Sequence, residues 1–153
     1  MKTMNKSGLI ISILIPLTVG AISSLLSGSM SYSAFNKPSF SPPGYLFPIV
    51  WTILYILMGI SSYIIYSSDN AGKDKALKTY TLQLIFNFFW SILFFGFSLY
   101  LFAFIWLIGL IILIIIMIYQ FYNINPLAAY LQIPYLLWCL FAAYLNYTIY
   151  TLN

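Results

Sequence analysis

Long apolar segments separated by short polar breaks dominate the chain. The breaks, rich in Ser, Pro, Gly, Asn or charged residues, lie at 30–44, 67–75 and 123–126, with a weaker Ser/Gly break near 96–100. They leave apolar segments near 8–29, 44–66, 79–97, 100–122 and 126–150. Each segment is close to the length of about 20 residues that an α-helix needs to cross a bilayer. The pattern therefore predicts five transmembrane helices.

Helices are favoured over strands for these segments. Inside the hydrocarbon of a membrane every backbone N–H and C=O group must pair within the protein, which leaves only helices and closed barrels. A membrane barrel requires alternating polar and apolar residues, and the five segments lack that alternation. We therefore expect an all-α integral membrane protein with a single domain over residues 1–153, built as a bundle of five transmembrane helices.

The composition strengthens the membrane assignment. The chain is 63% hydrophobic and only 5% charged, whereas soluble domains are about 25% charged. No charged residue follows Lys78, so everything from Thr79 onward would have to stay out of water. The lysines form no basic patch, and nucleic acid is not an expected partner. The single cysteine, Cys139, excludes a disulfide within the chain.

The distribution of lysines predicts the orientation in the membrane. With five spans, the N-terminus and the 67–78 segment lie on one side and carry five of the six lysines, while Lys37 alone lies on the other. The positive-inside rule places the lysine-rich side in the cytoplasm if the host membrane is a bacterial cell membrane. The N-terminus is then cytoplasmic.

The first apolar segment admits two interpretations. Lys2 and Lys6 precede an apolar core, as in a secretory signal peptide. Gly20, Ser24 and Gly28 recur every four residues, which favours a retained helix that packs closely against a neighbour. Ordinary tolerance of Ser and Gly in membrane helices explains the same spacing.

Conventional catalytic chemistry is absent. The chain has no His, Arg or Glu, and its two acids, Asp69 and Asp74, lie in the lysine-rich 67–78 segment. Acid–base pairs, metal clusters and a Ser-His-Asp triad are therefore excluded, and neither a metal nor a required cofactor is expected. No acidic or basic side chain lies within the predicted spans, so the usual signature of a proton-coupled pump is missing. What remains is aromatic: 14 Tyr, 13 Phe and 4 Trp.

Helical spacing arranges polar and aromatic residues of three segments into faces. The three sets are Pro48, Trp51, Tyr55, Gly59 and Ser62; Gln83, Asn87, Trp90 or Ser91, and Phe94; and Pro134, Trp138, Ala142 and Asn146. An amide that faces lipid is costly, so Gln83, Asn87 and Asn146 are expected to point into the bundle. The three faces predict an aromatic, uncharged pocket for a planar apolar ligand.

The same residues also fit purely structural roles, in which they hold the helices together rather than contact a ligand. An intramembrane amide such as Asn87 commonly forms interhelical hydrogen bonds rather than ligand contacts. A tryptophan near the end of a span commonly anchors the helix at the interface, which suits Trp106 first and Trp90 second. Trp51 and Trp138 lie well inside their spans beside Pro48 and Pro134, which are expected to bend the helices. Lining a pocket and packing the bundle both stay open for these two indoles.

Three ordered segments carry family-specific patterns. They are KPSFSPPGYLFPIVWTILYILMGISSY (37–63), NFFWSILFFG (87–96) and PYLLWCLFAAYLNYTIYTLN (134–153). They resemble, respectively, the K-P-x-x-x-P-P…V-W-x-x-L-Y-x-x-M-G, N-x-x-W-S-x-x-F-F-G and P-Y-x-x-W…A-x-x-L-N signatures of the tryptophan-rich sensory proteins. This family is also called the translocator proteins or peripheral-type benzodiazepine receptors. The resemblance covers nearly the whole chain.

The resemblance implies a five-helix membrane protein, often a homodimer, that binds porphyrins such as protoporphyrin IX. It also implies binding of isoquinoline-carboxamide and benzodiazepine ligands. By motif position, Trp51, Asn87, Trp138 and Ala142 would line the pocket, and the 30–43 loop would cover it as a lid. The expected ligand-binding residues are Tyr32, Lys37, Trp51, Asn87, Trp90, Trp138, Ala142 and Asn146.

Three functional hypotheses follow. The first is a receptor that binds porphyrin as ligand or substrate and promotes its light-dependent oxidation, with Trp51 and Trp138 donating electrons or trapping oxidants. The others are a tetrapyrrole transporter, for which the chain shows no inverted repeat or charged coupling site, and a non-catalytic stress-sensing membrane partner. Cholesterol is not an expected ligand, because no basic residue follows Leu145 and Tyr147 to complete the sterol pattern.

Overall fold

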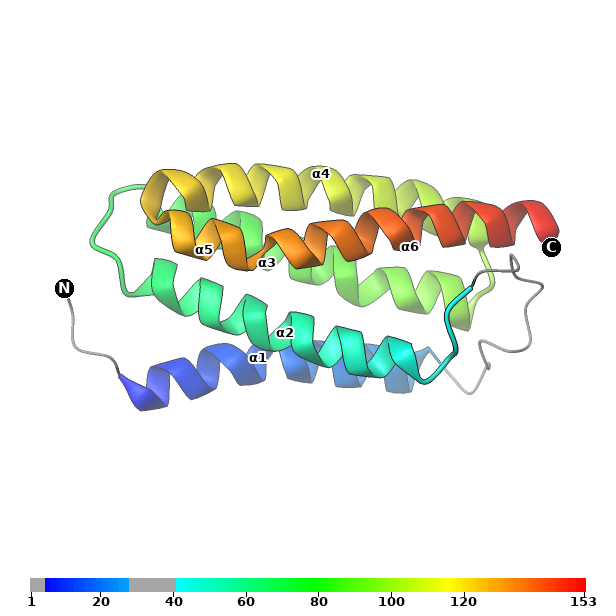
Figure 1. Ribbon diagram of the computed structural model, residues 1–153, viewed down its shortest axis with the longest axis horizontal. Coiled ribbons are helices and arrows are strands. Elements are labelled where there is room, and N and C mark those ends of the chain that lie inside the picture. Colours follow the sequence, from blue (N-terminus) through cyan, green and yellow to red (C-terminus); the bar gives the residue numbers. More distant parts are fainter. Residues whose placement is uncertain (1–4, 28–40) are drawn as a thin grey trace.

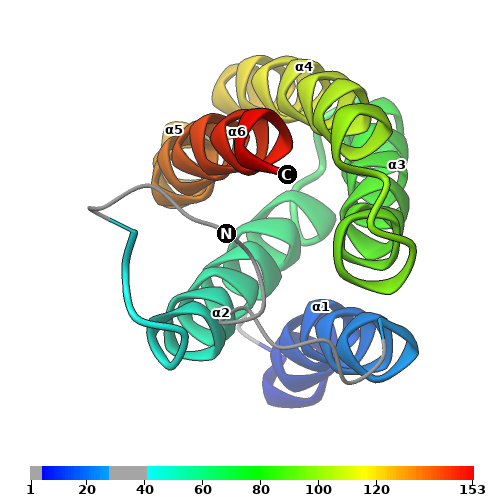
Figure 2. The ribbon, with the colours of Figure 1, turned by 90° about the vertical axis from the view of Figure 1, so that its right-hand side faces the viewer.

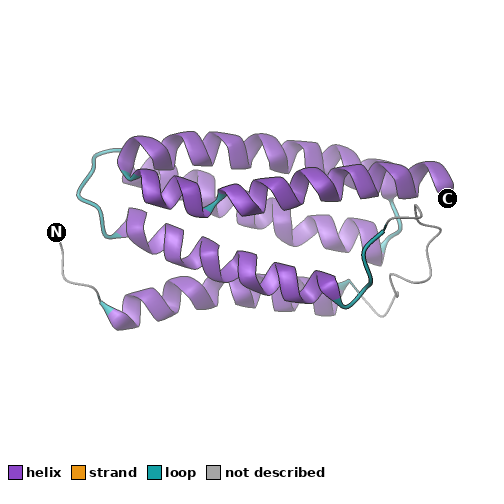
Figure 3. Ribbon diagram, viewed as in Figure 1, coloured by secondary structure: helices purple, strands orange, loops and turns teal. Residues whose placement is uncertain are grey.

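A computed structural model describes residues 5–27 and 41–153 (Figure 1). Its helices are α1 (Lys6–Leu26), α2 (Leu46–Tyr66), α3 (Lys73–Ser91), the π-helix η2 (Ile92–Gly96), α4 (Tyr100–Ile124), α5 (Pro126–Leu131) and α6 (Ile133–Leu152). Within these described ranges helices and loops occur without any β-strand (Figure 3). Five helical segments, counting α3 with η2 and α5 with α6, are long and apolar enough to cross a membrane. The predicted all-α bundle of five spans is confirmed.

The spans run along one long axis and are arranged around a ring (Figures 1 and 2). Around the ring α1 packs on α2, α2 on α5, α5 and α6 on α4, α4 on α3, and α3 returns to α1. We call the end at which Asn153 lies the C-terminal end, and the end with the α2–α3 connection the N-terminal end. The C-terminal end also holds the last turns of α1 and the first turns of α2.

The interior of the bundle is closely filled by large side chains from three helices. Met58 and Ile65 of α2, Ile114 and Phe121 of α4, and Tyr135 of α6 are each at most 1% exposed. Isoleucines and leucines dominate the outer surface of the bundle. This apolar exterior is what a membrane-embedded helix presents to lipid.

The third span begins earlier than predicted. The helix α3 begins at Lys73, before the predicted start of the apolar span at residue 79. Hydropathy marks the part of a helix that lies in hydrocarbon, whereas the charged first turns from Lys73 to Lys78 continue the helix into the polar interface.

The two prolines near the expected pocket both lie in the first turn of a helix. Pro48 lies in the first turn of α2, where the missing N–H has no intrahelical partner to lose, so the expected bend at Pro48 is wrong. Pro134 stands in the first turn of α6, and the last span is interrupted two residues earlier at Gln132, between α5 and α6. A break within one turn before Pro134 is what its missing N–H predicts.

Two glycines allow α1 and α2 to pack closely. A Cβ added at Gly59 would meet backbone atoms of Ser12 and Ile13, and one added at Gly20 would meet the ring of Tyr55. The close packing that the small-residue spacing predicts is therefore confirmed at Gly20. Gly28, the last member of that spacing, lies outside the described residues.

Candidate ligand-binding site

A cavity of ≈ 540 Å³ lies at the C-terminal end of the bundle, among α1, α2, α3, η2 and α6. This main cavity falls within the range of about 300–1,000 Å³ that is typical of small-molecule sites. Five of the predicted ligand-binding residues line it: Trp51, Asn87, Trp90, Ala142 and Asn146. No charged side chain is among its described lining residues.

A chain of hydrogen bonds through the buried core fixes the amide of Asn87. Tyr55 Oη donates to Asn87 Oδ1 at 2.8 Å, and Asn87 Nδ2 donates to Tyr135 Oη at 2.9 Å. Tyr135 Oη in turn donates to Gln83 Oε1 at 2.7 Å. The inward orientation predicted for Gln83 and Asn87 is confirmed, because their side chains are 0% and 4% exposed. Asn87 thus joins α2, α3 and α6 and also faces the main cavity.

A second pair of polar contacts joins α3 to α6 and to the start of α4. Trp90 Nε1 donates to Asn146 Oδ1 at 3.0 Å, and Asn146 Nδ2 donates to the Tyr100 carbonyl at 2.9 Å. Asn146 is 1% exposed, as the inward prediction requires, and Trp90 is 9% exposed. The interfacial-anchor interpretation of Trp90 is therefore wrong, since its indole N–H points into the bundle.

Trp51 forms an aromatic wall of the main cavity. Its ring stacks on Tyr55, with the centroids 5.5 Å apart and the planes at 28°. Its ring also meets Tyr135 edge-on at 6.1 Å. Both partners belong to the hydrogen-bonded chain of Asn87, so packing and hydrogen bonding together hold the indole against the cavity.

Three serines form a polar wall, and the sequence reasoning had placed only Ser91 of these on a candidate inward face. Ser23 Oγ donates to the Phe88 carbonyl at 2.7 Å, and the hydroxyls of Ser23 and Ser27 lie 3.0 and 2.7 Å from Ser91 Oγ. These contacts join the last turns of α1 to α3 beside the cavity. Ser23 and Ser27 were not part of the predicted spacing of Gly20, Ser24 and Gly28, although their own separation of four residues places them on one helix face.

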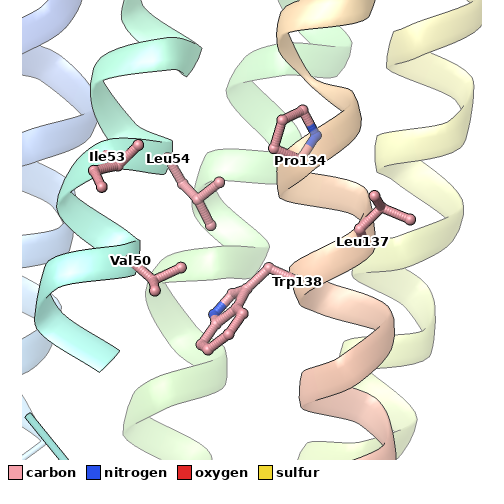
Figure 4. A pocket seen from close by; sticks show the side chains of 6 residues that line it. All are labelled: Val50, Ile53, Leu54, Pro134, Leu137 and Trp138. Atoms are coloured by element: carbon pink, nitrogen blue, oxygen red, sulfur yellow. The ribbon is translucent and has the colours of Figure 1, made fainter. Parts of the chain in front are cut away.

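Trp138 lies outside the main cavity. With Val50, Ile53, Leu54, Pro134 and Leu137 it lines a smaller cavity of ≈ 410 Å³ between α2 and α6 (Figure 4). Its ring lies 5.6 Å from the ring of Phe47, which does line the main cavity. The indole Nε1 of Trp138 is buried and has no hydrogen-bond partner. Trp138 therefore does not line the main cavity itself, but it packs against Phe47, which does.

Two predicted contacts cannot be placed. Tyr32 and Lys37 lie outside the described residues, together with residues 30–40 of the expected 30–43 lid. Among the described residues no group of three or more His, Cys, Asp or Glu side chains gathers that could hold a metal ion. The described part of the site thus offers aromatic faces, amides and hydroxyls.

Comparison with known proteins gives concordant matches. The model of the TspO/MBR family matches residues 12–152, a range that includes every described residue lining the main cavity. The chain is 39% identical over 153 residues to the Tryptophan-rich protein TspO of Archaeoglobus fulgidus, covering 98% of this chain and 99% of that protein. It is 33% identical to the Tryptophan-rich sensory protein of Cereibacter sphaeroides (90% and 84% covered). It is 34% identical to the Translocator protein of Homo sapiens (80% and 74% covered).

Proposed function

The chain belongs to the TspO/MBR family and is an integral multi-pass membrane protein, and on this premise we propose that its main cavity binds porphyrins of the protoporphyrin IX type. Family membership supports a membrane role of the receptor or transporter type. The observation that carries the porphyrin proposal is the uncharged cavity walled by Trp51 and by the amide of Asn87. A flat apolar macrocycle matches such a wall, because aromatic contacts contribute about 0.5–1.5 kcal/mol beyond burial.

The polar groups of the site have distinct roles in this proposal. The amide of Asn87 still has one N–H and one oxygen lone pair for a ligand after its bonds to Tyr55 and Tyr135. We propose that the ammonium group of Lys37, which lies outside the described residues, pairs with a propionate group of the porphyrin. Planar isoquinoline-carboxamide and benzodiazepine ligands would use the same aromatic wall.

Light-dependent oxidation of the bound porphyrin is the second part of the proposal. Dissolved dioxygen is the oxidant in this proposal, and the light-excited macrocycle activates it by energy or electron transfer, so no acid–base group of the protein is required. The indole of Trp51 borders the cavity, so it can give one electron to the excited macrocycle, which passes that electron on to dioxygen to form superoxide, or it can trap the oxygen species that form. Trp138 contributes less, because it reaches the cavity only through Phe47.

Illumination of the protein with bound protoporphyrin IX tests both parts. In detergent we expect saturable binding, and we expect the porphyrin absorbance to fall under light and not in the dark. Trp51→Phe should slow that loss if the indole donates electrons and speed it if the indole traps oxidants, and Trp138→Phe should have a smaller effect in the same direction. Trp106→Phe is the matched control, because Trp106 stacks on Phe86 and lines neither cavity. Absence of binding would refute the receptor proposal, and wild-type rates in both test variants would refute the indole role alone.

A further inference from the structure

A second large cavity, of ≈ 690 Å³, lies toward the N-terminal end of the bundle, between α1 and α3. Its walls run from Gly8 to Val19 on α1 and from Leu77 to Phe89 on α3, and the last turns of α2 close its inner side. At 1.5 Å per residue these walls are about 16 and 18 Å long. One leaflet of a bilayer has a hydrocarbon depth of about 15 Å. This α1–α3 cavity therefore has the length of a single leaflet.

The wall of the α1–α3 cavity is suited to hydrocarbon. Its hydroxyls at Ser62 and Thr81 are satisfied locally, because they donate to the Gly59 and Leu77 carbonyls at 3.0 and 2.9 Å. Most of the remaining wall consists of Ile, Leu, Val and Phe side chains. Ile11 and Ile15 are 57% and 49% exposed, so the cavity opens sideways toward the surrounding lipid. An apolar chain can enter from the bilayer without breaking these two hydrogen bonds, although the buried Tyr80 hydroxyl, which also lines the cavity, has no hydrogen-bond partner among the described residues.

A fixed positive charge marks the polar end of this cavity. Tyr66 lines that end, and Lys73 Nζ donates to the Tyr66 carbonyl at 3.3 Å and lies 5.6 Å from the centre of its ring. The first two turns of α3 also carry Lys75 and Lys78 against a single acid, Asp74. The charge at the interface is thus positive, directly beside the polar end of the α1–α3 cavity.

We propose that the α1–α3 cavity binds one long fatty-acyl chain of an anionic amphiphile, whose headgroup meets Lys73. An anionic phospholipid and a free fatty acid share this chemistry. The site is separate from the main cavity in position and in lining, so it can be occupied whether or not a porphyrin is bound.

Native mass spectrometry of the purified chain tests this proposal with three probes added separately: palmitoyl-oleoyl-phosphatidylglycerol, oleate and palmitoyl-oleoyl-phosphatidylcholine. Ile15→Trp places an indole in the cavity mouth. Its control is Ile115→Trp on α4, which has a similar exposure (52% against 49%) but lines none of the three cavities described above. Lys73→Gln removes the charge beside Tyr66, and Lys75→Gln is its control. Helicity and elution volume verify that each variant folds.

We expect saturable retention of one phosphatidylglycerol per chain, lost in Ile15→Trp and kept in Ile115→Trp. Lys73→Gln should weaken retention about fivefold, the effect of one lysine near an anionic surface, and Lys75→Gln should weaken it less. Retention of oleate in place of the phospholipid, with the same response to Ile15→Trp, would support the proposal with a free acid as the source. No saturable binding, equal losses in both tryptophan variants, or equal retention of phosphatidylcholine would overturn it. If the wild-type protein is a dimer and Ile15→Trp is a monomer with unchanged lipid retention, the proposal would also be overturned, since a second copy would then cover this face.

Discussion

Gly59→Ala is expected to destabilise the bundle by about 1–3 kcal/mol, the usual effect of forcing an extra carbon into a packed interior. The new Cβ would meet the Cα of Ile13 and the carbonyl oxygen of Ser12. Backbone atoms cannot rotate away as a side chain can, so α1 would have to move off α2. This loss is expected even though alanine is the better helix former by about 1 kcal/mol.

Gly109→Ala provides the matched comparison for Gly59→Ala. A Cβ at Gly109 would approach only the ring of Phe86, at 3.3 Å from Cε2, and a ring edge can shift by the small distance required. Thermal unfolding in one detergent should therefore show a lower midpoint for Gly59→Ala and an unchanged or higher midpoint for Gly109→Ala. Equal midpoints for the two variants would contradict the close backbone contact between α1 and α2.

Asn87→Leu is expected to destabilise the protein by about 2–4 kcal/mol. The substitution leaves the Tyr55 hydroxyl without its acceptor and removes the bond from Asn87 Nδ2 to Tyr135. A buried donor without a partner costs about 1–3 kcal/mol, and the lost bond adds about 0.5–1.5 kcal/mol. The buried chain through Asn87 would then end at Tyr135 and Gln83.

A double-mutant cycle separates this effect from lost packing. Tyr55→Phe removes the hydroxyl that Asn87→Leu leaves unpaired, so the double variant should be more stable than the sum of the two single effects predicts. The coupling should fall in the range of about 0.5–3 kcal/mol that is typical of residues in contact. Strict additivity in equilibrium unfolding would mean that the hydrogen bond from Tyr55 to Asn87 contributes nothing to stability.

The five spans could be predicted from the sequence because hydropathy reports directly on burial in hydrocarbon. The inward amides followed from the same physics, since Gln83, Asn87 and Asn146 would be costly in lipid. The start of α3 at Lys73 could not be predicted in this way, because its first turns lie in the polar interface where hydropathy carries no helix signal. The position of Pro48 in a first turn depends on where α2 begins, and helix starts are poorly determined by composition.

The candidate site was only partly predictable because a cavity depends on neighbours in space. Helical spacing could align Trp138 with Ala142, but it could not show that Phe47 of α2 packs against Trp138 and itself lines the main cavity. The contact of Ser23 with Ser91 likewise depends on which face of α1 meets α3. Spacing within one helix contains no information about either pairing.

Titration of protoporphyrin IX into the wild-type protein and Ala142→Trp, followed by porphyrin absorbance, tests the central claim most directly. Ala142 lines the main cavity and is 7% exposed, so a tryptophan there would occupy the space proposed for the macrocycle. Leu140→Trp is the control, because Leu140 is 47% exposed and lines none of the three cavities. We predict saturable binding to the wild type and to Leu140→Trp, and none to Ala142→Trp. Equal binding to all three proteins, or no binding to the wild type, would contradict the assignment of the main cavity as a porphyrin site.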